Sequence, residues 1–196
     1  MKKTLTIGLT LLAGLSLTAC GGNNNNNNKT SSGSGNNTAQ TTSNSKITVD
    51  LDEYNVKSAK TYNVNYENTD WDEADVKVNK VTVYKLAKPY TLDSINGKYE
   101  INGFVKLDMS VKANGDISIF PSQGTAVIGN EQEDAITEAW DGEINSGAEK
   151  SGAVYIPVKN LDKVTSINNL RFKFDGSDQN NFDSRHDYDL TFDLNN

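Results

Sequence analysis

The 196-residue chain is poor in the side chains that usually carry catalysis or bind metals, with one cysteine, Cys20, and one histidine, His186. A lone cysteine cannot form an internal disulfide, and the chain after residue 45 has no thiol for catalysis or for a zinc site. Ser184 and Asp187 adjoin His186, but sequence neighbours do not form a catalytic triad, which is assembled in space. We therefore expect no catalytic residues and no metal site of the cysteine–histidine type.

Long apolar runs and excess positive charge are also lacking. Only one apolar run occurs, at the N-terminus, which argues against a membrane protein with several spans. All 26 acidic residues lie within 46–196, together with 16 of the 19 basic residues, so this part carries a net charge of about −10. Such a charge argues against a nucleic-acid partner, whose phosphates it would repel.

The first twenty residues have the pattern of an export signal. Met1-Lys2-Lys3 is positively charged, and about thirteen apolar or small residues follow from Leu5 to Leu17, too few to span a bilayer. The run ends in Leu17, Thr18, Ala19 and Cys20, which resembles the lipobox of bacterial lipoproteins. That resemblance implies that residues 1–19 are a signal peptide, that a peptidase recognises Leu17, Thr18 and Ala19, and that Cys20 carries a diacylglyceryl anchor. Two acyl chains would hold the protein permanently on the extracellular face of the cell membrane.

Residues 20–45 are predicted to be a tether. Of the 25 residues in 21–45, 22 are Asn, Ser, Thr or Gly, and Asn23–Asn28 is a run of six asparagines. Such a composition cannot form a hydrophobic core, so we expect this segment to be disordered. It would lift the acidic domain away from an anionic membrane surface by more than the Debye length of about 8 Å.

Residues 46–196 alternate between apolar and polar side chains with a period of two, which predicts strands with one buried face. We expect an all-β, immunoglobulin-like antiparallel β-sandwich of about seven to nine strands, with a closed barrel as the alternative. A bulge at Asn79-Lys80 would keep Val76, Val78, Val81 and Val83 on one face. Asn114-Gly115-Asp116 favours a hairpin, and Pro157 favours an edge position for the strand 154–158.

Two further local predictions concern the last strands and a helix. The strands 170–175 and 188–194 should pair antiparallel, with Arg171 and Lys173 across from Asp189 and Asp193. A single short helix is predicted after Asp134, where Ile136, Ala139 and Trp140 have helical spacing.

Three stretches together support a family resemblance. They read GFVKLDMSVKANGDISIFPSQGTAVI at 103–128, DGEINSGAEKSGAVYIPV at 141–158 and LRFKFDG at 170–176. In these features the chain resembles uncharacterised lipoproteins of Gram-positive bacteria, whose extracellular domain is an immunoglobulin-like sandwich similar to a secreted mycobacterial immunoprotective antigen. The resemblance covers about half of the chain. It implies a fold and a location but no activity, because the family has no agreed one.

The best candidate binding loop joins the last two strands. Residues 175–187 include Asp175, Asp178, Asp183 and Asp187, and an oxygen-rich loop of this kind can bind calcium, although its spacing does not fit an EF-hand. Trp71, among acidic residues, is a second binding candidate, but packing as a lid over the core is the favoured interpretation.

These observations favour a non-catalytic binding or interaction module at the cell envelope. Its partner would be an unknown envelope protein or glycan. The alternatives are an enzyme or enzyme inhibitor acting on envelope polymers, and a phage-exclusion or stress lipoprotein. No cofactor is expected, apart from the calcium considered above.

Overall fold

The computed structural model describes residues 45–94, 97–136, 140–181 and 183–195. The predicted signal peptide, Leu17, Thr18, Ala19, Cys20 and the tether up to residue 44 lie outside the described residues. No helix within the described ranges is long and apolar enough to cross a membrane.

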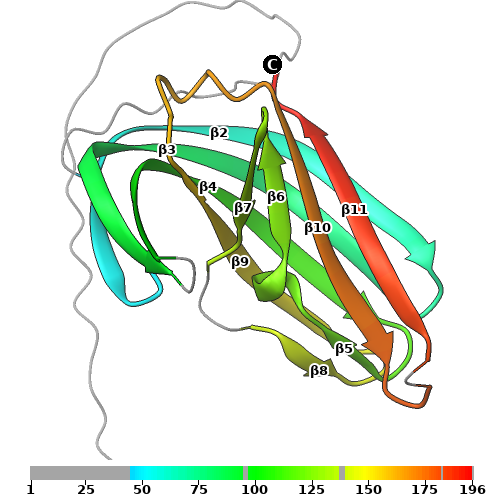
Figure 1. The fold of residues 1–196 in the computed structure, drawn as a ribbon. Helices are drawn as coiled ribbons and strands as arrows, with labels where there is room; N and C mark the ends of the chain where they lie inside the picture. The colour runs from blue at the N-terminus through cyan, green and yellow to red at the C-terminus, as the bar shows by residue number, and fades with distance from the viewer. Residues whose placement is uncertain (1–44, 95–96, 137–139, 182, 196) are drawn as a thin grey trace, which may run out of the picture. The chain divides into compact units, whose positions relative to one another are not determined.

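The described residues form eleven strands and one turn of 3-10 helix, η1 (Figure 1). The strands are β1 (Ser45–Val49), β2 (Asp52–Trp71), β3 (Ala74–Ser94), β4 (Gly97–Ala113), β5 (Ile117–Ile119), β6 (Thr125–Ile128), β7 (Glu131–Asp134), β8 (Gly142–Ile144), β9 (Glu149–Val158), β10 (Asn169–Asp178) and β11 (Arg185–Asp193), with η1 at Pro121–Gln123. The all-β prediction is confirmed. The strands outnumber the seven to nine expected, because short segments that pair over three or four residues have little periodicity to recognise.

All strand pairs are antiparallel, and the strands divide into two sheets. One sheet has the order β1-β2-β3-β4-β9. The other has the order β7-β6-β10-β5-β8, with β11 on the second edge of β10. This arrangement is a sandwich rather than a closed barrel. The immunoglobulin-like topology stays a prediction.

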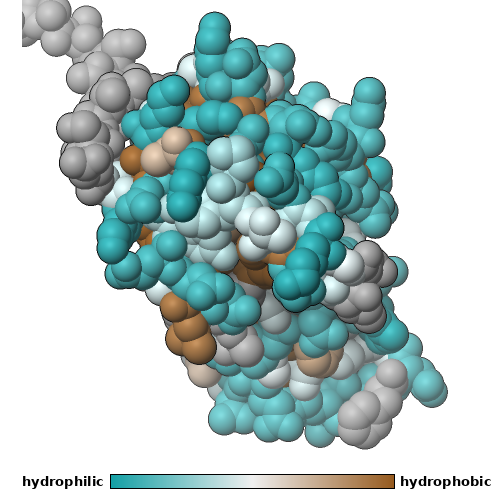
Figure 2. All heavy atoms as spheres, turned by 60° about the vertical axis from the view of Figure 1, so that its left-hand side comes forward, coloured by the Kyte–Doolittle hydropathy of each residue, from teal (hydrophilic) through white to brown (hydrophobic). Residues whose placement is uncertain are grey.

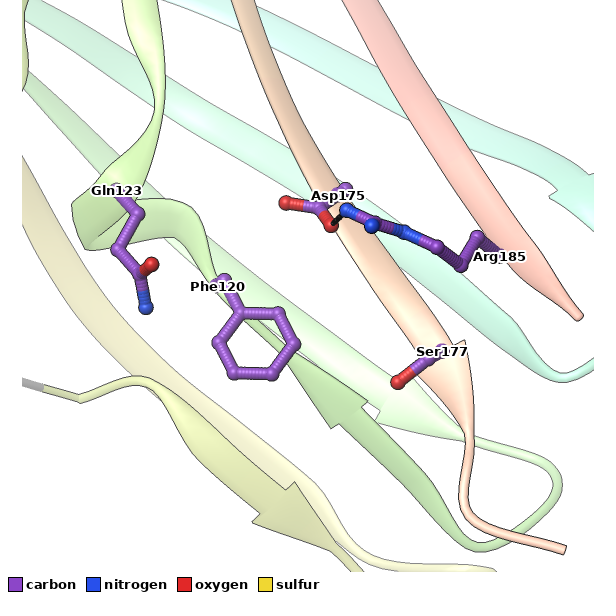
Figure 3. Close-up of a pocket in the computed structure, with 5 residues that line it drawn as sticks. All are labelled: Phe120, Gln123, Asp175, Ser177 and Arg185. Carbon is purple, nitrogen blue, oxygen red and sulfur yellow. Dashed lines mark hydrogen bonds and ion pairs between the residues drawn. The ribbon is translucent and has the colours of Figure 1, made fainter. Parts of the chain in front are cut away.

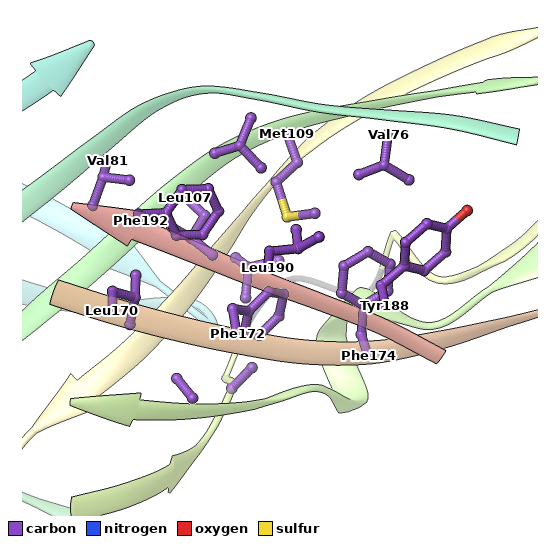
Figure 4. Close-up of a cluster of buried hydrophobic side chains, with 14 of the residues drawn as sticks. Val76, Val81, Leu107, Met109, Leu170, Phe172, Phe174, Tyr188, Leu190 and Phe192 are labelled. Atoms are coloured by element: carbon purple, nitrogen blue, oxygen red, sulfur yellow. The ribbon is translucent and has the colours of Figure 1, made fainter. Parts of the chain in front are cut away.

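The main core lies between the inner faces of the two sheets (Figure 4). Val76, Val78, Val81 and Val83 on β3 are all fully buried. The ladder between β3 and β4 shifts by one residue between Val78 and Lys80, which confirms the predicted bulge. The six-stranded sheet contributes an aromatic and leucine layer from β10 and β11: Leu170, Phe172, Phe174, Tyr188, Leu190 and Phe192.

A second, smaller core forms where the long strands separate into two hairpins. Tyr54 of β2 packs edge-on against Tyr90 of β3 and Phe104 of β4, with ring centroids 5.0 and 4.9 Å apart. The ladder between β3 and β4 is irregular between Lys85 and Tyr90, a stretch that includes Pro89. The resulting cluster contains Val49, Tyr54, Leu86, Ile101 and Phe104.

Two local predictions are confirmed and one is confirmed in part. The strand that contains Pro157, β9, lies at the edge of its sheet, as proline requires. Strands β10 and β11 pair antiparallel. Asp189 pairs with both Arg171 and Lys173, but Asp193 instead accepts hydrogen bonds from Asn195.

The hairpin predicted at Asn114-Gly115-Asp116 is wrong. This turn carries the chain from the five-stranded sheet into β5 of the other sheet. Both edges of β4 are already paired, with β3 and β9, so no edge remains for a hairpin partner. The turn is held instead by the backbone N–H groups of Asn114 and Gly115, which donate to the Glu73 carbonyl at 2.8 and 3.2 Å.

The predicted short helix falls largely on residues 137–139, outside the described residues. Its flanks are not helical: Asp134 ends β7, and Ile136 forms a bridge with Tyr155 of β9. Trp140 is buried beside Gly152.

The turn between β1 and β2 is strained and yields a test of stability. Asp50 and Leu51 have φ angles of 48° and 72°, a conformation that glycine adopts without penalty and leucine does not. Leu51 is also 86% exposed, so its side chain gains little from burial. We expect Leu51→Gly to raise the free energy of unfolding by about 1 kcal/mol, measured by urea denaturation.

The matched control is Leu51→Ala, which removes the same apolar surface but keeps the positive φ. We expect its stability to stay within about 0.5 kcal/mol of the parent. Equal stabilisation by both variants would contradict backbone strain as the cause.

Candidate functional site

A pocket forms on the outer face of the six-stranded sheet because two short strands share one edge of β10. β6 pairs with Arg171–Lys173, and β5 pairs with Gly176–Asp178 further along the same edge. Between these two stretches the chain leaves the sheet and makes the turn η1. Phe120 starts this turn, and its N–H donates to the carbonyl of Asp175 at 2.9 Å.

The return into β6 requires a residue without a side chain. A Cβ atom on Gly124 would lie 2.6 Å from both the Lys173 carbonyl and the Phe172 ring. Gly124 therefore lets the chain come close enough to the edge of β10 to start β6 in register.

The pocket has a volume of about 310 Å³ and is shown in Figure 3. We call it the Phe120 pocket. Its walls come from three places in the chain: the β5–η1 segment, the end of β10 and the start of β11. The lining residues are Phe120, Gln123, Asp175, Ser177 and Arg185.

The polar side chains of the Phe120 pocket are held by specific partners. Arg185 extends from β11 to form an ion pair with Asp175 on β10 (Figure 3). On the other side, the Gln123 amide nitrogen donates to Asp141 Oδ2 at 3.2 Å, and Asp141 Oδ1 accepts from the Ser122 N–H at 2.7 Å. The carboxylate and guanidinium thus face each other and supply one charge of each sign among the lining residues, while Asp187 stands beside them, directly across from Asp175.

Only one of the residues singled out from the sequence lines this pocket, namely Asp175. Asp178 instead accepts a hydrogen bond from the Asn180 N–H at 2.8 Å. Asp183 is exposed between the strands, and Asp187 lies on β11 directly across from Asp175.

The acidic loop 175–187 is shorter than predicted. Asp175–Asp178 belong to β10 and Arg185–Asp187 to β11, which leaves six residues between the strands. The periodic apolar pattern stops at Phe174, although the ladder of β10 with β11 continues to Ser177. The residues after Phe174 lack the alternation that marks a strand, so the sequence predicted a loop there. Within the described ranges, no three His, Cys, Asp or Glu side chains are grouped as metal ligands. Calcium binding stays a prediction.

Trp71 ends β2 in the five-stranded sheet, and its ring packs against the inner side of β10 and β11, as the favoured lid interpretation predicts. It is 9% exposed and stacks parallel to the His186 ring, with centroids 5.5 Å apart. A Cβ atom on Gly176 would lie 3.1 Å from the indole, so Gly176 makes room for it. Trp71 and His186 therefore support β10 and β11 beneath the Phe120 pocket.

Phe120, Gln123, Ser177 and Arg185 were missed by sequence reasoning. Phe120 carried a usable signal: Ile117 and Ile119 face the core, so the next residue had to face outward. A large aromatic residue on the outer face of a strand, followed by proline, marks a break in the sheet. The other three residues were not recognisable, because only the strand register brings them together.

Two other cavities lie elsewhere in the described residues. One of about 410 Å³ is lined mainly by amide and apolar side chains, including Asn130, Asn160 and Ile167. One of about 500 Å³ lies beside the buried Glu133, whose carboxylate pairs with Lys159 at 2.7 Å. The 500 Å³ cavity also contains an aromatic ring, Tyr99, beside this ion pair, but its wall adjoins residues 95–96 and 137–139, which lie outside the described residues. We take the Phe120 pocket as the candidate, because it combines a half-buried aromatic ring with an oriented ion pair and two neutral polar groups, and its lining residues adjoin no such gap.

Comparisons with known proteins found structures of low similarity. No protein-family model matches the chain, and no curated protein matches it in sequence. A functionally unknown protein from Listeria monocytogenes EGD-e has a similar structure, with a TM-score of 0.47 and 13% identity over 69% of this chain and 88% of that one. A Bacillus subtilis protein described as a "putative lipoprotein (ycdA)" has a TM-score of 0.39 and 15% identity over 63% of this chain and 38% of that one. One of these two proteins is thus described as a lipoprotein. Both similarities are low, and neither assigns a function or confirms an immunoglobulin-like topology.

The outer face beside the pocket is charged. The face of the molecule seen in Figure 2 is mostly hydrophilic, with a few hydrophobic patches. Asp189 accepts a hydrogen bond from Arg171 Nε at 2.6 Å and lies 3.3 Å from the Lys173 ammonium. The hydrogen bond from Arg171, and next that from Lys173, lower the pKa of Asp189 to about 2. A carboxyl whose pKa falls on folding stabilises the fold above its unfolded pKa, and this stabilisation is lost as the pH falls through the folded value.

We therefore expect Asp189→Asn to destabilise the protein slightly at pH 7, by about 0.5 kcal/mol, because the pair is exposed. The difference from the parent should shrink between pH 4 and pH 2, as measured by urea denaturation across that range. Asp193→Asn is the control, since this carboxylate contacts Asn195 rather than a basic residue. A pH-independent loss in Asp189→Asn would argue against the ion pair.

Proposed function

We propose that this protein is a lipid-anchored lipoprotein on the extracellular face of a Gram-positive cell membrane. The observation that carries the proposal is the position of Cys20, the chain's only cysteine, directly after Leu17, Thr18 and Ala19 at the end of a short apolar run. This is the lipobox pattern. A segment rich in Asn, Ser, Thr and Gly then separates Cys20 from the folded part, and as the tether that its composition predicts it would leave the sandwich free to reach envelope components.

The sandwich acts as a non-catalytic binding module, and the Phe120 pocket is its binding site. The pocket is built on paired strands and a braced turn, so its polar groups are held in place before a ligand arrives, which lowers the cost of binding. Its residues do not include a nucleophile activated by a base. An aromatic ring, an ion pair, a hydroxyl and an amide are groups that orient a ligand.

The anchor is tested by feeding cells a radiolabelled fatty acid. We expect the protein to be labelled and to remain with the membrane fraction, and we expect Cys20→Ala to lose the label. The matched control is the double variant Cys20→Ala/Asn25→Cys, which keeps one cysteine but places it after Asn23 and Asn24 instead of after Thr18 and Ala19. Labelling of that double variant would show that any N-terminal cysteine suffices and would contradict the lipobox assignment.

The binding site is tested by photo-cross-linking in intact cells. A photoreactive residue replaces Gln123, which is exposed on the rim of the pocket, or Thr191, which is exposed on β11 outside it. We expect an adduct with an envelope component from position 123 and none from position 191. Equal adducts from both positions, or none from either, would contradict a binding site at the pocket.

A further inference from the structure

We propose that the Phe120 pocket binds a neutral sugar ring of an envelope glycan. This inference rests on the proposed function, because it names the ligand class of the same site. The first support is the arrangement of the walls. Phe120 provides a flat apolar surface, and the polar groups of Asp175 and Arg185 stand on the neighbouring strands (Figure 3). A pyranose has the matching surfaces, namely a C–H face and a rim of hydroxyl groups.

The second support is the ion pair in the wall of the pocket. Because Asp175 and Arg185 already form an ion pair, an anionic ligand must compete with Asp175 for the guanidinium, and a cationic ligand must compete with Arg185 for the carboxylate. The hydroxyl groups of a neutral ligand can hydrogen-bond to both side chains without breaking this ion pair. The guanidinium has five N–H donors and the carboxylate about four acceptor positions, so both retain capacity after pairing.

The third support comes from the neutral polar groups and the size. The Ser177 hydroxyl and the Gln123 amide each offer a donor and an acceptor, which suits the mixed character of sugar hydroxyls. A volume of about 310 Å³ lies at the lower end of the range for small-molecule sites, so one ring fits better than a long oligomer. The net charge of about −10 on residues 46–196 further disfavours polyanionic ligands.

The proposal is tested by saturation-transfer NMR on the full chain purified in detergent. The probes are methyl β-glucoside and methyl β-N-acetylglucosaminide, which are neutral, with glucuronate and glucosamine as anionic and cationic counterparts of the same ring. We expect transfer to at least one neutral probe, and at least about threefold weaker binding of both charged ones.

Four variants link such binding to the pocket. Phe120→Leu keeps an apolar side chain but removes the flat ring, and we expect it to weaken binding by about threefold or more. Phe120→Tyr keeps the ring and should bind as the parent does. Asp175→Asn breaks the ion pair and should also weaken binding. Val127→Ala, on the same sheet but outside the pocket, is the control, and unchanged circular dichroism confirms that each variant is folded.

Three results would overturn the sugar assignment: preference for glucuronate or glucosamine, absence of transfer to every probe, or binding that Phe120→Leu leaves unchanged. The cross-linking at position 123 separates this failure from failure of the proposed function. An adduct with a protein there, without sugar binding, overturns the sugar proposal and leaves the binding module in place.

Discussion

The edge of β10 is the constraint on which the outer surface of the sandwich depends. Two short strands, β5 and β6, must share that edge, and the chain between them has to leave the sheet and come back. Gly124 makes the return possible, because any side chain there would meet the Lys173 carbonyl and the Phe172 ring. The hollow beside Phe120 is a direct result of this interruption, since a continuous strand would present a flat surface.

The inner face of β10 explains why the interruption does not weaken the sheet. Phe172 and Phe174 lie in the main core, and Trp71 fills the space that Gly176 leaves. Strand β11 pairs with β10 along the whole of its other edge. The pocket is therefore supported from below by close packing and from the side by a complete ladder, so its lining residues start from fixed backbone positions.

The residues show which parts of this structure could be predicted. Alternation along β3, β10 and β11 identified the buried faces, and the change of parity at Asn79 located the bulge, because burial imposes a period of two on any strand with one apolar face. Sheet membership was not predictable in the same way. Asn114-Gly115-Asp116 has the composition of a hairpin turn, yet it joins two sheets, since the partners of β4 were decided by β3 and β9. For the same reason Asp175 was recognised as polar but not as the partner of Arg185, which depends on a register between strands.

The small cluster around Tyr54 lies next to β1, the first strand of the fold, whereas the main core lies between the two sheets. The chain enters through β1, which pairs only with β2 over five residues and helps to enclose the small cluster around Tyr54. A pulling force applied on the N-terminal side of Ser45 therefore acts first on this short hairpin and not on the long ladders of β2, β3 and β4. With the proposed anchor at Cys20, β1 and the small cluster would bear such a force before the main core does, because they lie nearer to the anchor along the chain.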